Sequence, residues 1–237
     1  MNEDRIERYA RQLLVPGFGA EAQDRLGRAR VRAVGADAVA SAGLVFLVQA
    51  GVGRLWIEDA EDVSPADVSG WLFAPSSVGT PRVDAARAVL APLSRFVSVE
   101  RYPTGGVPTA TLVFASSVPQ ALASAESARR AGIPHVVLEP DADGGALVVV
   151  PPGAPCYACA RSTTGVGRPA QPGIAALSAL AAQELVLMIA NPGSIPGRRI
   201  DLVRGVVTTR PTMRLAGCAC GGTAGAGEGD AAEDRRA

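Results

Sequence analysis

The chain has 237 residues, 48% of them hydrophobic and 19% charged, and its 23 basic and 23 acidic side chains give a formal net charge of zero. A chain of this size can bury a full core, and the balanced charge argues against a nucleic-acid or membrane-surface partner. All 23 basic residues are arginines, which excludes a Schiff-base lysine, a phosphate-loop lysine and self-modification on lysine.

The sequence contains no recognisable signal or membrane segment. Residues 1–8 are charged and lack the apolar core of a secretory signal. The longest apolar stretches, near 42–50 and 174–190, are interrupted by Gln49, Gln183 and Glu184. We therefore expect a cytoplasmic protein, in which four cysteines are thiols or metal ligands rather than disulfides.

Hydrophobic periodicity predicts two N-terminal helices followed by alternating strands and helices. The helices are expected at 4–14, 19–28, 38–50, 82–91, 119–131 and 173–190, and the strands at 31–34, 54–58, 97–101, 111–115, 134–139, 146–151, 198–204 and 206–214. This alternation is typical of an α/β fold with a doubly wound, mostly parallel, Rossmann-like sheet. We expect an N-terminal helical pair at 1–28, an α/β domain at 29–220 and a disordered tail at 221–237, where Gly, Ala and acidic residues offer nothing to bury.

The segment Arg30–Ser41 runs from a strand into a helix through what should be a glycine-rich phosphate loop, yet only Gly35 of the expected glycines is present. Such loops use glycines for the tight turn, for the approach of backbone N–H groups to phosphate and for close packing of helix on strand. Asp37, Ala38 and Ala40 occupy the later places. A methyl group crowds the phosphate, and a carboxylate repels it.

Five short motifs together carry a resemblance to a known family. They are Arg8-Tyr-Ala-Arg-Gln-Leu-Leu14, Gly17-Phe-Gly-Ala-Glu-Ala-Gln23, Ala50-Gly-Val-Gly-Arg-Leu55, Val78-Gly-Thr-Pro-Arg-Val83 and Pro155-Cys-Tyr-Ala-Cys159. In this order they resemble the ThiF/MoeB/HesA family, the bacterial relatives of ubiquitin-activating enzymes, over roughly residues 5–220. The resemblance implies a protein that uses ATP and magnesium to adenylate the C-terminal glycine of a ubiquitin-like or sulfur-carrier protein.

The resemblance also assigns nucleotide-binding positions. Arg11 matches an arginine that reaches the nucleotide across a dimer. The acidic residue that binds the ribose is matched by Asp59, with Glu58 a close rival. The phosphate lysine of the family falls on Arg82, which keeps the charge and changes its geometry.

Other positions depart from the family pattern. The asparagine, arginine and glutamine that follow the second strand fall on Asp67, Gly70 and Trp71, and the magnesium-binding aspartate falls on Ser117. No cysteine lies at 160–173, where some members place a conjugating thiol. Because adenylyl transfer depends on positioned cations, these combined losses indicate a degenerate member, a pseudoenzyme in which ATP and magnesium binding are doubtful.

Each candidate also has an ordinary structural interpretation. Gly35 can persist because the turn needs it, and Asp37 can cap the following helix. Asp59 and Arg82 can be surface charges. His135, the single histidine, lies in an apolar strand and is interpreted as a core residue. Ser116 and Ser117 are interpreted as a polar loop, and burial is expected for Trp56 and Trp71.

The cysteines form a C-x-x-C pair, Cys156 and Cys159, and a C-x-C pair, Cys218 and Cys220. Four thiolates suit tetrahedral zinc, and glycines beside the second pair let backbone N–H groups point at sulfur. The one-residue spacing of the second pair departs from the two residues of the family. Structural zinc is the favoured interpretation, with free thiols as the alternative.

The sequence therefore favours a non-catalytic subunit or scaffold that binds a protein or peptide tail. We expect residues 4–28 and 38–50 to take part in a homodimer, or in a heterodimer with an intact family member. The alternative is an active adenylyltransferase. A nicotinamide-dependent oxidoreductase is disfavoured because two glycines and any acid–base set are missing.

Overall fold

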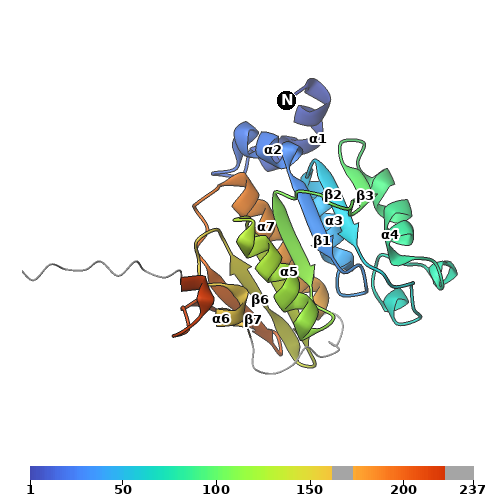
Figure 1. The fold of residues 1–237 in the computed structure, drawn as a ribbon. Helices are drawn as coiled ribbons and strands as arrows, with labels where there is room; N and C mark the ends of the chain where they lie inside the picture. The colour runs from blue at the N-terminus through green and yellow to red at the C-terminus, as the bar shows by residue number, and fades with distance from the viewer. Residues whose placement is uncertain (162–172, 222–237) are drawn as a thin grey trace, which may run out of the picture.

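The computed structural model describes residues 1–161 and 173–221, which form an eight-stranded sheet with helices on both faces (Figure 1). The strands are β1 (Arg30–Val34), β2 (Arg54–Glu58), β3 (Ser98–Arg101), β4 (Ala110–Phe114), β5 (His135–Asp141), β6 (Gly144–Val150), β7 (Arg198–Val203) and β8 (Val206–Pro211). The helices are α1 (Glu3–Leu13), α2 (Gly19–Arg28), α3 (Ser41–Ala50), α4 (Arg82–Leu90), α5 (Val118–Arg130), α6 (Tyr157–Ala160) and α7 (Gly173–Ala190). Short 3-10 turns lie at Asp67–Ser69, Pro75–Ser77, Ala91–Leu93 and Ala219–Gly221.

The strand order β3-β2-β1-β4-β5-β6-β7-β8 confirms the expected doubly wound sheet. The five strands β1 to β5 pair in parallel, and β6, β7 and β8 each pair antiparallel with the strand before them. The order reverses between β1 and β4. In an open α/β sheet, the crevice at the carboxyl ends of two such strands is the usual ligand position.

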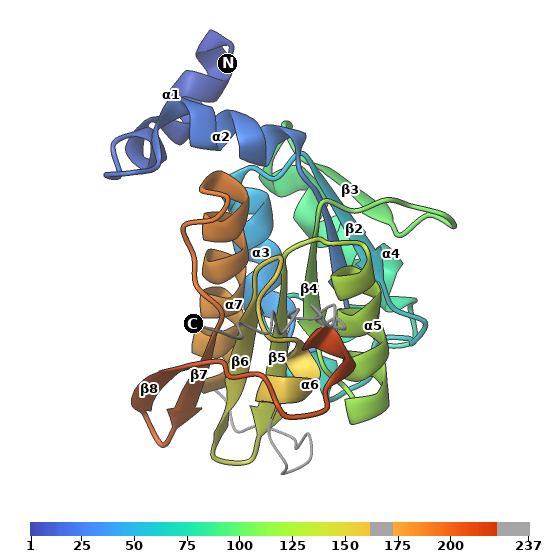
Figure 2. The same ribbon diagram turned by 60° about the vertical axis from the view of Figure 1, so that its left-hand side comes forward.

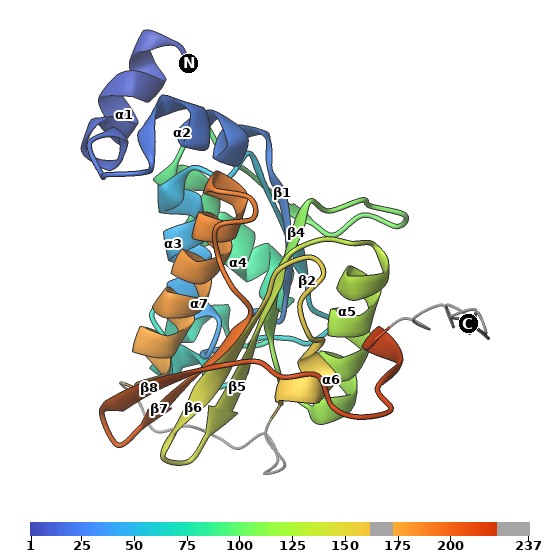
Figure 3. The same ribbon diagram turned by 90° about the vertical axis from the view of Figure 1, so that its left-hand side faces the viewer.

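Two apolar layers cover the sheet. Helices α3 and α7 lie on one face, and α5 and α6 lie on the other (Figure 3). On the first face α3 packs directly on α7, and the amide of Gly43 donates to Ser178 Oγ at 2.9 Å. A Cβ at position 43 would lie 2.8 Å from Phe114 Cζ and 2.9 Å from the carbonyl oxygen of Ser178. The close approach of the two helices therefore depends on glycine at this position.

The N-terminal helices lie at the amino end of the parallel strands, away from the crevice (Figure 2). Helix α1 begins at an Asn2 side chain that accepts from Arg5 N at 3.2 Å. Its buried Tyr9 packs against Phe96, with ring centroids 6.3 Å apart, and Gln12 donates to the carbonyl of Ala50 at the end of α3. These contacts attach α1 to the domain and leave its outer side exposed.

Helix α7 is long and apolar enough to cross a membrane when only its length and composition are considered. In the fold most of it is buried against α3, β4, β5 and β6. Such burial is typical of the core helix of a globular domain. The helix expected at 173–190 is therefore present, and its length and composition alone did not show that it lies in the core.

Two expected elements differ in their bounds from the structure, and one helix was not expected. The helix expected at 38–50 begins at Ser41, because the preceding residues form turns whose amides bond to Asp37. The last strand ends at Pro211 rather than 214. The single-turn helix α6 was not expected, since four residues within a Pro- and Gly-rich loop carry no periodic signal. The expected disorder of 221–237 lies, beyond Gly221, outside the described residues.

We expect Gly43→Ala to lower the free energy of unfolding by about 1–3 kcal/mol, because its methyl group overpacks the contact between α3 and α7. The matched control is Gly27→Ala in α2, where the added methyl meets only the end of the flexible Arg5 side chain. This control should be neutral or more stable by up to about 1 kcal/mol, owing to the higher helix propensity of alanine. Urea unfolding of the three proteins measures both changes. Equal unfolding curves for Gly43→Ala and the unmodified chain would contradict the packing argument.

Candidate functional site

The candidate nucleotide crevice lies at the carboxyl ends of β1, β2 and β4. The chain leaves β1 at Gly35, which has a φ of +93°, and turns close to β4. A Cβ at position 35 would lie 2.9 Å from the carbonyl oxygen of Phe114. Both the left-handed backbone and the close approach require glycine, so the fold itself explains why this glycine is present.

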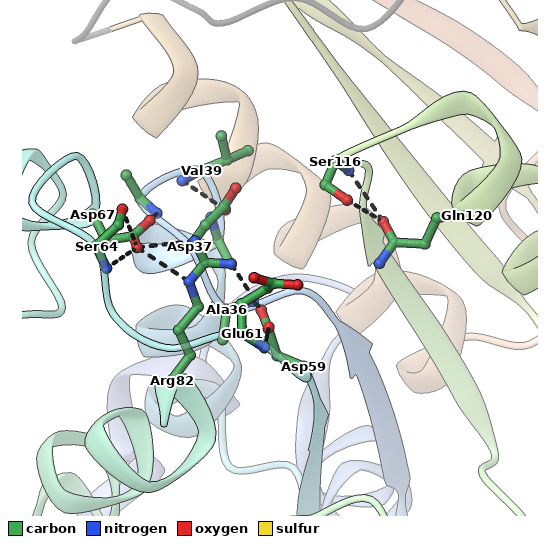
Figure 4. A network of polar contacts seen from close by, with 12 residues as sticks. Ala36, Asp37, Val39, Asp59, Glu61, Ser64, Asp67, Arg82, Ser116 and Gln120 are labelled. Atoms are coloured by element: carbon green, nitrogen blue, oxygen red, sulfur yellow. Dashed lines mark hydrogen bonds and ion pairs between the residues drawn. The ribbon is translucent and has the colours of Figure 1, made fainter. Parts of the chain in front are cut away.

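Carboxylates of the chain itself accept hydrogen bonds from the amides of this loop (Figure 4). Asp59 Oδ2 accepts from Ala36 N at 2.8 Å, and Asp67 Oδ1 accepts from Ala38 N at 3.3 Å. Asp37 Oδ1 accepts from the next two amides, those of Val39 and Ala40, at 3.0 and 3.2 Å. In a phosphate-binding loop such amides point at the ligand instead.

Arg82, at the start of α4, neutralises part of this negative charge. Its Nε and Nη2 atoms donate to Asp67 Oδ2 at 3.1 and 2.9 Å, and its Nη1 lies 3.5 Å from Asp59 Oδ2. Asp67 Oδ2 also accepts from the backbone and hydroxyl of Ser64, each at 2.8 Å. Arg82 is thus an internal ion-pair partner, in contact with two of the three carboxylates.

The three carboxylates have different environments. Burial raises the pKa of Asp37, against the opposing effects of its backbone hydrogen bonds and of Arg82. Burial acts in the same direction on Asp67, but the hydrogen bonds from Ser64 and Arg82 outweigh it and lower the pKa. The pKa of Arg82 is raised, since its bonds to Asp67 and the charges of all three carboxylates outweigh its own burial. The pair of Asp67 and Arg82 is therefore held in its charged form.

The segment after Asp67 lies directly against the loop. A Cβ at Gly70 would lie 2.5 Å from Ser41 Oγ and 2.9 Å from Ala38 Cα. An arginine, which the family pattern places at position 70, has no space here unless the backbone moves. The neighbouring Trp71 is 68% exposed, so the expectation of burial is wrong for Trp71, whereas Trp56 is buried as expected.

Across the crevice, the end of β4 continues into a polar turn. Ser117 caps α5, with its side chain accepting from Gln120 N, and Ser116 donates through its hydroxyl to Gln120 Oε1 at 2.7 Å. The interpretation of both serines as a polar loop is in agreement with these bonds. No carboxylate stands at position 117, where the family pattern places a metal-binding aspartate.

The acidic residue beside the loop is Asp59 rather than Glu58. Glu58 Oε2 instead pairs with Arg32 Nε at 2.6 Å. The second oxygen of Asp59 accepts from Glu61 N at 2.9 Å. Both oxygens of Asp59 therefore bind backbone amides of the chain.

The four cysteines, expected to form a metal site, come together at the end of α6. Their sulfur atoms lie within 4.8 Å of one another. Three pairs are separated by 3.6–3.7 Å, Cys156 with Cys159, Cys156 with Cys218, and Cys159 with Cys220. Zn–S bonds of about 2.3 Å in a tetrahedron place sulfur atoms about 3.8 Å apart, so this arrangement can hold a metal ion. The one-residue spacing of Cys218 and Cys220 does not prevent convergence.

Burial raises the pKa of the Cys156 thiol to about 12. A metal ion that binds here must therefore displace a proton. The amide of Leu215 points at Cys159 Sγ, at 3.4 Å. A backbone N–H directed at sulfur is the kind of donor that supports a thiolate ligand.

The part of the chain that forms the crevice matches a known protein family. Residues 9–120 match the ThiF family. This stretch contains the loop, the three carboxylates and Arg82.

Three relatives, two of them named as adenylyltransferases, each match less than half of the chain. The chain is 36% identical over 102 residues to the sulfur carrier protein adenylyltransferase of Thermus thermophilus, which covers 43% of this chain and 38% of the relative. It is 33% identical over 100 residues to the molybdopterin-synthase adenylyltransferase of Salmonella typhimurium, covering 42% and 40%. It is 38% identical over 96 residues to the vegetative HesA protein of Trichormus variabilis, covering 40% and 36%. The matched segments span less than half of each of these relatives.

Solved structures extend the likeness of fold to most of the chain. E. coli MccB with ATP superposes with a TM-score of 0.78 at 19% identity, covering 90% of this chain and 74% of MccB. PaaA superposes with a TM-score of 0.72 at 18% identity, covering 91% and 76%. The likeness of fold therefore extends beyond residues 9–120.

Arg11 does not join the other nucleotide candidates of the ThiF region. It is exposed on α1, at the amino end of the sheet, whereas Gly35, Asp59 and Arg82 lie at the carboxyl end. Within residues 1–161 and 173–221, the side chain of Arg11 makes no hydrogen bond or ion pair. Arg11 therefore does not reach the crevice of its own chain.

Sequence reasoning missed one buried polar group, Glu139 on β5 and Arg199 on β7, which are 7% and 6% exposed. Arg199 Nη1 donates to Glu139 Oε2 at 2.7 Å. A usable signal was present, because charged residues inside apolar strands are seldom buried unless they are paired. The identity of the partner, 60 positions away, is not readable from either strand alone.

His135 is 1% exposed, as expected for a core residue, and its Nδ1 lies 3.1 Å from the carbonyl oxygen of Ile133. Burial lowers its pKa to about 4, with a smaller lowering by Arg129 and an opposing effect of Glu126. As the pH falls, His135 is protonated first in the unfolded chain, where its pKa is 6.5. The stability that depends on neutral His135 is therefore complete above pH 6.5 and is lost as the pH falls toward 4.

We expect the unmodified chain to lose about 2 kcal/mol more unfolding free energy between about pH 7 and pH 5 than His135→Leu, whose side chain does not titrate. Denaturant unfolding at both pH values measures the difference. Carboxylates and thiols titrate in both proteins and cancel in this comparison. Parallel losses in the two proteins would mean that His135 is not buried in its neutral form.

Proposed function

We propose that this chain is a non-catalytic member of the ThiF group, which acts as a subunit or scaffold for a protein or peptide tail. The observation that carries the proposal is the use of the loop amides by the chain itself. Four of them, at positions 36, 38, 39 and 40, donate to Asp37, Asp59 or Asp67. A triphosphate would have to displace these carboxylates and overcome their charge.

Two further features support this proposal. The loop contact of Gly70 leaves no room for a catalytic cation at that position. Arg82, the one cation beside the loop among the described residues, is already bonded to Asp67 and lies close to Asp59. Because adenylyl transfer needs positioned cations to neutralise developing charge, a site with three carboxylates and one paired arginine is poorly suited to it.

A protein partner is supported by exposed apolar side chains outside the crevice. Val206 and Val207 on the edge strand β8 are 63% and 58% exposed, and Met213 and Leu215 just after it are 76% and 57% exposed. An edge strand with exposed apolar side chains is a usual place for another chain to dock. Relatives named for sulfur-carrier protein and molybdopterin synthase suggest a ubiquitin-like or sulfur-carrier protein as that partner.

The proposal includes a structural zinc ion held by the four cysteines Cys156, Cys159, Cys218 and Cys220. The donor set is all sulfur, and its spacing suits a closed tetrahedral site. A closed site of this kind contributes to folding rather than to catalysis. Here it would join the end of the chain after β8 to the loop before α6.

The proposal also includes a dimer formed by α1, α3 and α7. These helices, with the segment after α1, line a hollow of about 1080 Å³. Its lining includes Arg11, Val15 and Phe46. Leu14, Val15 and Phe46 are 83%, 53% and 46% exposed. Exposed apolar side chains gathered beside a hollow are typical of a protein interface. A second copy of this chain, or an intact ThiF relative, would cover these side chains. Arg11 of this chain would then lie at the crevice of that partner.

The alternative is an active adenylyltransferase that binds ATP after the carboxylates move aside. We expect no ATP–pyrophosphate exchange by the unmodified chain with a carrier protein ending in Gly-Gly, and no saturable Mg-ATP heat in calorimetry. Asp67→Asn removes one charge from the loop, so this variant should gain Mg-ATP binding without gaining exchange. Carrier-dependent exchange by the unmodified chain, with micromolar ATP binding, would establish the alternative instead.

Ser117→Asp is the matched control for the loss of the metal aspartate. Aspartate caps a helix as well as serine does, so α5 should keep its start and the protein its stability. Removing a positioned charge costs about 100- to 1000-fold in rate, and the other departures remain. We therefore expect Ser117→Asp alone to give no exchange. Exchange restored by this single change would mean that the loop is open to triphosphate.

For the dimer, we expect Phe46→Glu to weaken association, because it places a charge in an interface that excludes water. Val107→Glu is the control, since Val107 is 68% exposed in the loop before β4, away from α1, α3 and α7. Sedimentation velocity of each protein, alone and mixed with an intact ThiF relative, measures the effect. Monomers in both settings, or association that Phe46→Glu leaves unchanged, would refute this interface.

A further inference from the structure

Helix α6 consists of one turn, Tyr157–Ala160, which contains Cys159 and is preceded by Cys156 at its N-cap. An isolated turn of this length is not stable, because nucleating a helix costs more than its first hydrogen bonds return. No side-chain hydrogen bond caps its start at Cys156. The orientation of Cys156 and Cys159 must therefore be set by contacts with the rest of the fold.

A buried ion pair holds both ends of this turn. At the C-terminal end, Arg199 Nη1 on β7 donates to the carbonyl oxygen of Ala160 at 3.0 Å. At the N-terminal end, the hydroxyl of Tyr157 donates to Glu139 Oε1 at 2.7 Å. Glu139 Oε2 in turn accepts from Arg199 Nη1 at 2.7 Å, so the two ends share one ion pair.

The ion pair is almost fully buried and has a further partner. Glu139 and Arg199 are 7% and 6% exposed, and Arg199 Nε is held from its other side by Asp201 Oδ1 at 2.8 Å. Desolvating two charges costs free energy that their attraction often only offsets, so such a pair is weak evidence for stability. It is better explained by the geometry that it imposes, because a planar guanidinium fixes several partners at once.

We propose that Glu139 and Arg199 are positioning residues for the cysteine site, acting through Tyr157 and the carbonyl of Ala160. They orient the α6 turn so that Cys156 and Cys159 meet Cys218 and Cys220 at ligand distance. The inference rests on the metal site of the proposed function and is independent of the nucleotide crevice. It assigns a role to charges that lie outside both sites.

The test uses the full chain loaded with zinc, and then with cobalt. Tyr157→Phe removes only the hydroxyl that bonds to Glu139 and keeps the ring in the core. We expect its zinc dissociation constant, measured by chelator competition, to rise by about 10- to 100-fold, as is usual when a partner that orients ligands is lost. The cobalt absorption bands, which report the geometry of thiolate ligands, should shift as well.

Tyr102→Phe is the matched control. Tyr102 also donates one hydroxyl bond, to the carbonyl of Gly106 at 2.7 Å, at the other end of the sheet order near β3. Its loss should leave zinc affinity and the cobalt bands unchanged. A change as large as that of Tyr157→Phe would mean that a general loss of stability weakens the metal, and the inference would fail.

Arg199→Lys tests the cation without leaving Glu139 buried beside a neutral residue. Lysine keeps the charge but lacks the fork that reaches Asp201, Glu139 and Ala160 together, so zinc affinity should fall about as far as in Tyr157→Phe. Equal affinity and equal cobalt spectra in the unmodified chain and in both variants would overturn the inference while leaving the metal site in place. A chain that takes up neither metal would remove the site and the inference together.

Discussion

The hydrogen bonds from the β1–α3 loop to Asp37, Asp59 and Asp67 are the interaction on which the rest of the site depends. They satisfy backbone donors at the switch point of the sheet. In a protein that binds a phosphate, the ligand accepts hydrogen bonds from these backbone amides. When the ligand is absent, water must accept those hydrogen bonds. Here the fold supplies the anions, and Arg82 supplies the counter-charge.

This arrangement separates the architecture of the fold from its chemistry. Gly35 and Gly43 are required by the approach of the loop to β4 and of α3 to α7, whatever the crevice binds. Both glycines lie within residues 9–120, which match the ThiF family. Asp67 contributes negative charge to the crevice and takes part in neither of these close contacts. The fold and the charge of the crevice are therefore set by different residues.

The antiparallel half of the sheet has a different source of order. Strands β7 and β8 form its edge, and β8 is exposed along its whole length. The cysteines connect the segment after β8 to the α6 turn, and Arg199 connects β7 to the same turn through Glu139. The cysteine contacts and the contacts of the Arg199–Glu139 pair thus meet at the short helix α6. This convergence explains how so short an element can hold a defined orientation.

The sequence by itself determined the order of helices and strands, the pairing of the two cysteine motifs and the burial of His135, because each depends on local periodicity or on ligand chemistry. It also indicated that the phosphate loop is unusual. Only the tertiary structure decided that Asp67 bonds to Ala38, that Trp71 is exposed and that Glu139 pairs with Arg199. These contacts join residues 29 and 60 positions apart in the two polar pairs. The physical reason is that a side chain's local pattern sets which face it occupies, whereas its partner is set by strand order and by the path of loops, which no local pattern encodes.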